Sequence, residues 1–174
     1  TGYEHEDEPG RAFWRDKFVA LDRDKAALCY ALARATGARR MVEAGTSFGV
    51  STLYLAAAAR DNGGGLVITC DIEPTKIERA RQHFDEAGLS EQIEVRLGDI
   101  RDSLVALAEP VDLLLLDIWA PVAADVVALV GPWLRPGGII IADNPTMRRA
   151  LYAGLFAYLG DPANGFTTQT LPFS

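Results

Sequence analysis

The chain has 174 residues, of which about half are apolar, and this length and composition are typical of one domain with a substantial core. Its 24 acidic and 17 basic residues give a formal charge of -7, which would repel a polyphosphate, so a nucleic acid is not expected as a partner. Its apolar runs are shorter than the roughly 18 to 20 residues of a membrane span, and Cys29 and Cys70 have neither metal-ligand nor disulfide spacing, which together favour a soluble protein of the reducing cytoplasm.

Short β-type runs alternate with helical runs along the chain, with glycine or proline between them. Residues 11–36 carry apolar side chains at three- and four-residue steps, which predicts one or two helices before the first strand. After them, helices are predicted at 51–60, 75–87, 102–108, 122–134 and 146–159. Strands are predicted at 41–44, 66–71, 93–97, 111–116, 139–142 and 166–173. This alternation predicts an α/β fold in which a mainly parallel central sheet has helices on both faces.

The elements form one predicted domain over residues 1–174. Its parts are N-terminal helices at 11–36, a ligand-binding core at 39–159 and a C-terminal edge strand at 166–173. Ligands of such sheets bind beyond the carboxyl ends of the strands, so functional residues are expected there. An acidic residue stands at or just after the carboxyl end of each of the first five predicted strands: Glu43, Asp71, Asp99, Asp117 and Asp143.

The loop after the first predicted strand is rich in glycine. Gly45 and Gly49 let the backbone pass close to a ligand without interference from side chains. The spacing is not the G-x-G-x-x-G of dinucleotide sites, and Glu43 beside the loop would repel a pyrophosphate. A P-loop ends in Gly-Lys-Ser or Gly-Lys-Thr, but no lysine stands between Lys25 and Lys76. Neither a dinucleotide nor a phosphate cradle is therefore expected here.

The same loop also matches G-x-S-x-G, the nucleophile turn of α/β-hydrolases, with Ser47 as the central serine. A hydrolase of this type needs an acid and then a histidine downstream of the serine. The only histidine after Ser47 is His83, which lies in a predicted helix and before Asp117. A serine hydrolase is therefore a distant alternative.

The ligand that remains is a nucleoside that carries a positive charge. Glu43 suits that charge, and Asp71, at the end of the second predicted strand, is placed to accept hydrogen bonds from ribose hydroxyls. With these residues the chain resembles the class I S-adenosylmethionine-dependent methyltransferases, and among them the catechol and caffeoyl-CoA O-methyltransferases. The segments that carry the resemblance are the cofactor loop at 42–52, the acidic turn at 71–74, the turn at 98–99 and the entry into the fifth strand at 133–138.

The resemblance implies a Rossmann-like methyltransferase fold that binds S-adenosylmethionine and methylates an oxygen of a small molecule, with a phenol as a candidate acceptor. It also implies a homodimer. The alternative is a protein of the same fold with another acceptor or no activity. The residues expected to contact the cofactor are Glu43, Gly45, Thr46, Ser47, Gly49, Ser51, Asp71, Ile72, Gly98, Asp99 and Asp117. Ser47 and Ser51 are equally suited to cap the following helix.

Three oxygen-bearing side chains follow the fourth and fifth predicted strands. Asp117, Asp143 and Asn144 are hard ligands that suit Mg²⁺, Mn²⁺ or Ca²⁺, and the same positions match the metal ligands of the family. The alternative for this trio is a structural capping role. Trp119 is a candidate wall for an aromatic acceptor. The family has a lysine base where this chain has Ala120, so either the metal alone activates the acceptor, another base substitutes, or the acceptor is not a catechol.

Overall fold

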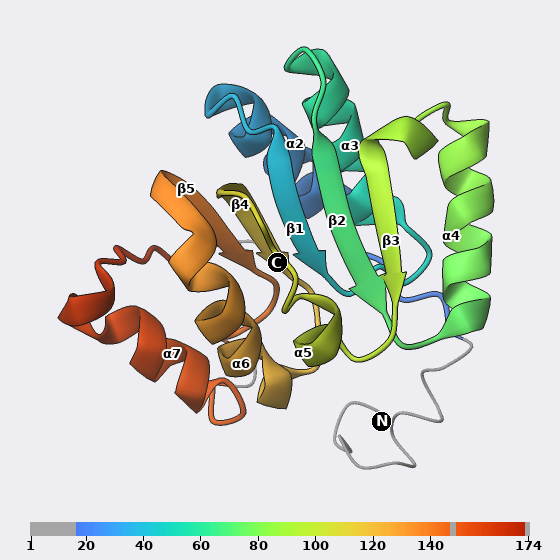
Figure 1. The fold of residues 1–174 in the computed structure, drawn as a ribbon. Helices are drawn as coiled ribbons and strands as arrows, with labels where there is room; N and C mark the ends of the chain where they lie inside the picture. The colour runs from blue at the N-terminus through green and yellow to red at the C-terminus, as the bar shows by residue number, and fades with distance from the viewer. Residues whose placement is uncertain (1–16, 147–148, 173–174) are drawn as a thin grey trace.

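The computed structural model describes residues 17–146 and 149–172, which fold around a central sheet (Figure 1). The strands are β1 (Arg40–Ala44), β2 (Leu66–Asp71), β3 (Ile93–Leu97), β4 (Val111–Leu116) and β5 (Leu134–Ala142). They lie in the order β3-β2-β1-β4-β5, and every neighbouring pair is parallel. The predicted α/β fold is therefore confirmed, with a sheet that is entirely parallel over these five strands.

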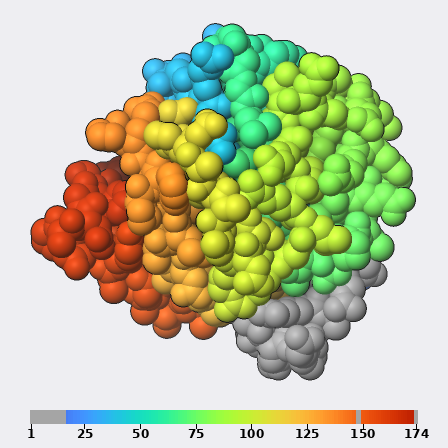
Figure 2. All heavy atoms as spheres, in the orientation of Figure 1, coloured from blue at the N-terminus to red at the C-terminus, as the bar shows by residue number. Residues whose placement is uncertain are grey.

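Helices cover both faces of the sheet. They are α2 (Arg23–Ala35), α3 (Val50–Asp61), α4 (Pro74–Glu86), α5 (Ile100–Ser103), α6 (Ala120–Val130) and α7 (Ala153–Gly160). In Figure 1, α2 and α3 lie behind the sheet, α5, α6 and α7 lie in front of it, and α4 runs beside β3. In the space-filling view from the same side, yellow and orange atoms of α5, α6 and β5 cover the middle of this face, and red atoms of α7 form one side (Figure 2).

The two helical layers bury opposite faces of the same strands. Successive side chains of a strand point to opposite faces, so Leu113 and Leu115 of β4 pack under α2 and α3, whereas Leu114 and Leu116 pack under α6 and α7. All four leucines are almost completely buried. Burial on both faces explains why β4 is a continuous apolar run instead of an alternating one.

Most predicted elements are confirmed, and β2, β3 and β4 have the predicted bounds. β5 starts earlier than predicted, at Leu134, which pairs with Val111 before a register shift in the ladder. The predicted helix at 122–134 ends at Val130 and is followed by a 3-10 turn, Gly131–Trp133. Pro132 in that turn lacks the N–H that an α-helix would need there.

Three predictions at the ends of the chain need correction. Within the predicted helical region 11–36, only Arg23–Ala35 is helical among the described residues, and 11–16 lie outside them. The predicted helix at 146–159 begins only at Ala153. The predicted strand at 166–173 is wrong over 166–172, where no strand forms and residue 173 is not described. Phe166 instead turns back and packs its ring 6.0 Å from that of Tyr158 on α7.

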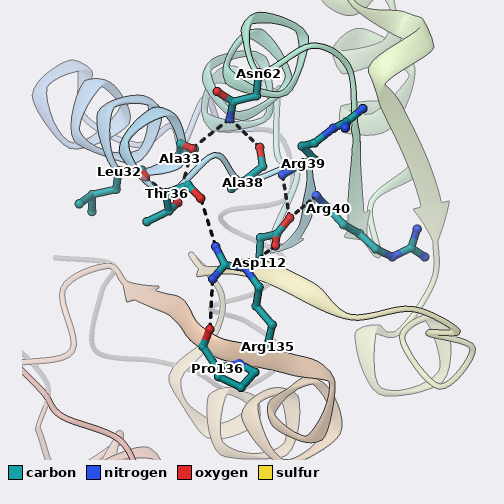
Figure 3. A network of polar contacts seen from close by, with 10 residues as sticks. All are labelled: Leu32, Ala33, Thr36, Ala38, Arg39, Arg40, Asn62, Asp112, Arg135 and Pro136. Atoms are coloured by element: carbon teal, nitrogen blue, oxygen red, sulfur yellow. Dashed lines mark hydrogen bonds and ion pairs between the residues drawn. The ribbon is translucent and has the colours of Figure 1, made fainter.

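At the amino end of the sheet, one carboxylate joins three strands. Asp112 of β4 accepts hydrogen bonds from the backbone N–H groups of Arg39 and Arg40 (2.7 and 2.8 Å) and from the Arg135 side chain of β5 (2.6 Å) (Figure 3). Arg135 also donates to the carbonyl of Thr36 at the end of α2 (3.2 Å). Burial acts to raise the pKa of Asp112, but these donors outweigh it and hold the pKa below its ordinary value.

We predict that Asp112→Ala lowers the free energy of unfolding by about 1 to 3 kcal/mol at neutral pH, because it leaves three donors, two of them partly buried, without their acceptor. Since a lowered pKa stabilises the fold above the unfolded value, the deficit should shrink as the pH falls below about 4. Urea denaturation at pH 7 and pH 3 measures both effects. Asp125→Ala, at an exposed site on α6, serves as the control. Equal stability of the two variants at pH 7 would contradict the role given to Asp112.

Candidate functional site

The carboxyl ends of the strands meet at one edge of the sheet. The parallel pairing continues one residue beyond β1, where Gly45 N–H donates to the carbonyl of Cys70 (3.1 Å). It also continues beyond β4, where Asp117 N–H donates to the carbonyl of Ala44 (3.0 Å), and beyond β5, where Asp143 N–H donates to the end of β4 (2.9 Å). Asp117 therefore lies between the glycine loop on one side and Asp143 on the other.

Both loop glycines are required by close packing within the protein. Gly45 has a φ of +101°, and a β-carbon on it would lie 2.0 Å from the carbonyl oxygen of Asp117. Gly49 has a φ of +83°, and a β-carbon there would lie 2.4 Å from the ring of Phe84 on α4. These two positions bring the loop against β4 at one end and against α4 at the other, so its path across the strand ends is fixed.

Asp71 at the end of β2 holds the same loop from the other side. Its Oδ2 accepts from the backbone N–H of Ser47 (2.8 Å), and its Oδ1 accepts from the N–H of Glu73 (2.9 Å). Each carboxylate oxygen can accept a further hydrogen bond. Ser47 has a φ of +44°, and its hydroxyl donates to the carbonyl of Val19 (2.5 Å). Asp71 and Ser47 thus form one unit, with acceptor capacity left on Asp71.

Glu43 is completely buried beneath the loop. Its Oε2 accepts from the hydroxyls of Thr52 and Thr69 (2.7 Å for Thr69), so the Thr46 hydroxyl, 2.6 Å from that of Thr69, must be the donor of that pair. Oε1 has no hydrogen-bond partner among the described residues. Burial raises the pKa of Glu43 to about 7, against the lowering effect of nearby hydroxyls that include that of Ser51 on α3.

Asp117 is the second acid of the site, and its side chain is partly buried. Burial, followed by the charges of Asp143 and Glu43, raises its pKa to about 7, while Lys25 acts in the opposite direction. The same three acids add to the effect of burial on Cys29 of α2, whose pKa is raised to about 12. A group of acids therefore lies under α2 at the ends of the central strands, and Cys29 is held as an unreactive thiol beside it.

The side chain of Lys25, on α2, contacts the residues that follow β5. Its Nζ donates to Asp143 Oδ1 (2.8 Å) and to Asn144 Oδ1 (2.9 Å), and Asp22 Oδ2 lies 3.4 Å away. Burial acts to lower the pKa of Lys25, but the contact with Asp143 outweighs it and the pKa lies above its ordinary value. Sequence reasoning missed this residue. The available signal was helical spacing, because Lys25 stands four residues before the buried Cys29 and shares its face of the helix.

The remaining predicted residues have varied surroundings. Asp99 caps α5 by accepting from Arg101 N–H (2.9 Å) and pairs with the Arg101 side chain (2.6 Å), while Gly98 before it has a φ of +137°. Ile72 is exposed beside Asp71. Trp119 is partly buried just before α6, and Ala120 begins that helix as a buried residue. Their roles toward a ligand stay predictions.

A hydrolase site does not form around Ser47. His83 Nδ1 lies 2.9 Å from the carbonyl oxygen of Phe48, and the Ser47 hydroxyl donates to Val19. Within the described part of the chain, no histidine is therefore hydrogen-bonded to the Ser47 hydroxyl. The match to G-x-S-x-G reflects a strained turn of the glycine loop and not a serine nucleophile.

Across the described ranges, no helix is both long and apolar enough to span a membrane.

Comparisons with known proteins agree on one family. A family model described as a methyltransferase domain matches residues 42–144, which include the glycine loop and all five strand ends. The chain is 30% identical over 130 residues to a catechol O-methyltransferase of Niastella koreensis, covering 72% of this chain and 58% of that protein. It is 32% identical over 127 residues to a catechol O-methyltransferase of Mycobacterium tuberculosis, covering 72% of this chain and 57% of that protein. The chain thus spans less than two thirds of the length of these relatives.

A solved structure shows the same fold. The O-methyltransferase TomG from Streptomyces achromogenes, involved in tomaymycin synthesis and solved in complex with SAM, superposes with a TM-score of 0.71. The sequence identity is 26%, and the match covers 91% of this chain and 71% of that one. The Rossmann-like methyltransferase fold implied by the sequence is therefore confirmed.

The raised pKa of Glu43 predicts that the stability of the fold depends on pH. The pKa of Glu43 lies near 7 in the folded chain against an ordinary value of 4.5. The protonation of Glu43 therefore contributes fully to the free energy of unfolding below pH 4.5, and this contribution is lost as the pH rises through 7. We predict a loss on the order of 3 kcal/mol from this group across that range, since one pKa unit corresponds to about 1.4 kcal/mol. Glu43→Gln should remove this part of the pH dependence, measured by denaturation from pH 4 to 8. Asp125→Asn should keep the slope of the parent, and an unchanged slope in Glu43→Gln would refute the assignment.

Proposed function

This chain belongs to the methyltransferase-domain family, and we propose that it transfers the methyl group of S-adenosylmethionine to an oxygen atom of a small molecule. The observation that carries the proposal is the unit formed by Asp71 and the glycine loop at the carboxyl end of the sheet. The oxygen acceptor is supported by the relatives, which are named as catechol O-methyltransferases, and by TomG, which is an O-methyltransferase with SAM bound.

The side chains of the site suit the chemical groups of the donor. Asp71 keeps free acceptor positions at the end of β2, where a ribose diol is expected in such sheets. Glu43 supplies a buried carboxyl group with one oxygen unpartnered among the described residues, next to the loop. Ile72, exposed beside Asp71, offers an apolar surface for the face of an adenine ring. The acids of the site favour a ligand that carries positive charge.

S-adenosylmethionine supplies a methyl group on a positively charged sulfur: the deprotonated acceptor oxygen would bond to the methyl carbon in line with the carbon–sulfur bond, which breaks and releases the neutral thioether S-adenosylhomocysteine. The chain contributes position and electrostatics. The loop fixed by Gly45 and Asp71 orients the donor. The strand ends at Asp117 and Asp143 hold the acceptor beside the donor. A phenol has an ordinary pKa near 10, so an acceptor of this kind needs a neighbouring positive charge to lose its proton near neutral pH.

Other predictions stay proposals. Metal ligation by Asp117, Asp143 and Asn144 is an expectation from the sequence that competes with Lys25, which already binds two of the three side chains. The homodimer rests on the resemblance, with the outer edge of β5 unpaired within the described residues. A cytoplasmic location is supported by Cys29 and Cys70, which are free and buried.

We predict that Asp71→Ala weakens S-adenosylmethionine binding about 10- to 100-fold, because a charged hydrogen-bond acceptor for the ribose and the anchor of the loop are both lost. Isothermal titration calorimetry measures the affinity. Glu91→Ala, on the exposed turn at the amino end of β3, removes the same charge far from the site and should bind like the parent. Equal affinity of the two variants would argue against the ribose position.

Transfer itself is tested with S-adenosylmethionine carrying a deuterated methyl group and a panel of catechols, simple phenols and thiols. Mass spectrometry should find the labelled methyl on oxygen of at least one phenol. Binding of the donor without transfer to any of these acceptors would favour the alternative of a binding protein without this activity. Transfer to thiols alone would contradict the oxygen acceptor.

A further inference from the structure

We propose that the ammonium group of Lys25, and not a divalent cation, is the positive charge at the acceptor end of this site. The inference rests on the proposed function for its meaning, since it assigns the charge that would hold the acceptor oxygen. It is carried by the position of Lys25 on the very side chains that the sequence nominates as metal ligands, Asp143 and Asn144.

Two of the three side chains in the predicted metal set already have hydrogen-bond partners. Asp143 Oδ1 and Asn144 Oδ1 both accept from Lys25 Nζ, at 2.8 and 2.9 Å. Asp143 Oδ2 accepts from Asn144 Nδ2 at 2.5 Å. Asn144 has a φ of +50°, a conformation that asparagine tolerates better than most residues. Within the described residues, therefore, two of the three predicted ligands form a closed arrangement around an ammonium group.

A divalent cation does not fit this arrangement. Mg²⁺ binds oxygen at about 2.0 to 2.1 Å and Ca²⁺ at about 2.3 to 2.6 Å, so an ion shared by Asp143 and Asn144 would take the place of the Lys25 ammonium and repel it. The trio has two carboxylates and one amide, and Lys25 occupies the oxygens of one carboxylate, Asp143, and of the amide, Asn144.

Lys25 is held firmly at this point. Its side chain is 15% exposed and that of Asp143 is 14% exposed, so solvent screens the ion pair little. The backbone of Lys25 lies in the first turn of α2, which packs on the sheet through Ala26 and Cys29. The ammonium is therefore part of the folded structure, positioned by the helix on one side and the strand ends on the other.

One of the three N–H groups of the Lys25 ammonium can donate a hydrogen bond to the oxygen of a methyl acceptor. Two are directed at Asp143 and Asn144, and the third contact is with Asp22 at 3.4 Å, whose side chain is 72% exposed. That contact is the weakest of the three because it is long and solvated. An acceptor oxygen could replace Asp22 and receive a hydrogen bond from a fixed cation. Such a cation comes from α2, whereas the lysine of the family would stand at Ala120 on the opposite helical layer.

The test measures Mn²⁺ binding by electron paramagnetic resonance in the absence of S-adenosylmethionine. The parent protein should leave millimolar Mn²⁺ free. Lys25→Met, which keeps the length of the side chain but removes its charge, should expose the oxygens and bind Mn²⁺ at least about tenfold more tightly. Arg23→Gln removes one charge from an exposed position of the same helix and should behave as the parent.

Either of two results would overturn the inference. Saturable Mn²⁺ binding to the parent, as tight as to Lys25→Met, would show that the ammonium does not exclude a metal. Absence of binding to a folded Lys25→Met, judged by its thermal melting, would show that the oxygens are not a ligand set for Lys25 to occupy. If Lys25→Met does not fold, Lys25→Gln replaces it in both comparisons. Calorimetry with S-adenosylmethionine on the same samples tests the proposed function separately, because loss of donor binding leaves the Mn²⁺ result unchanged.

Discussion

The reversal of strand order at β1 is the constraint on which the site depends. From β1 the chain builds outward through β2 and β3, and then returns to place β4 and β5 on the other side. The connecting helices consequently leave for opposite faces, and the ends of β1 and β4 stay open between them. Gly45 permits the closest contact at this point, because any β-carbon there would meet the backbone of Asp117. The donor loop and the acceptor end are thereby joined into one surface.

The electrostatics of this surface follow from burial. Glu43 and Asp117 lose solvent and have raised pKa values, whereas Asp71 accepts two backbone N–H groups at the rim. The positive charge of Lys25 offsets part of the acidic charge at the acceptor end. The donor half of the site is therefore acidic and suits a cationic cofactor, while the acceptor half carries a fixed ammonium. This division assigns different chemistry to neighbouring strand ends.

The sequence predicted the parts of the molecule that depend on local pattern. The apolar run of β4 and the acids after the strands could be read directly, because each is a property of one short segment. Contacts between distant segments could not. Lys25 meets Asp143 across 118 positions of the chain, and Asp112 meets Arg39 across 73. The false strand at 166–172 has the same cause, since its β-type residues are a local pattern, whereas in the described part of the chain they pair with no strand and Phe166 packs on α7 instead.

A crystal structure of the protein grown with S-adenosylhomocysteine and Mn²⁺ is the decisive measurement, because it locates the cofactor product and any metal together. The product is expected across residues 45–49, with its ribose on Asp71, and no anomalous manganese peak is expected among Asp117, Asp143 and Asn144. Lys25 should keep its contacts with Asp143 and Asn144. A nucleoside bound elsewhere, or a manganese peak on the three oxygens with Lys25 displaced, would contradict these expectations.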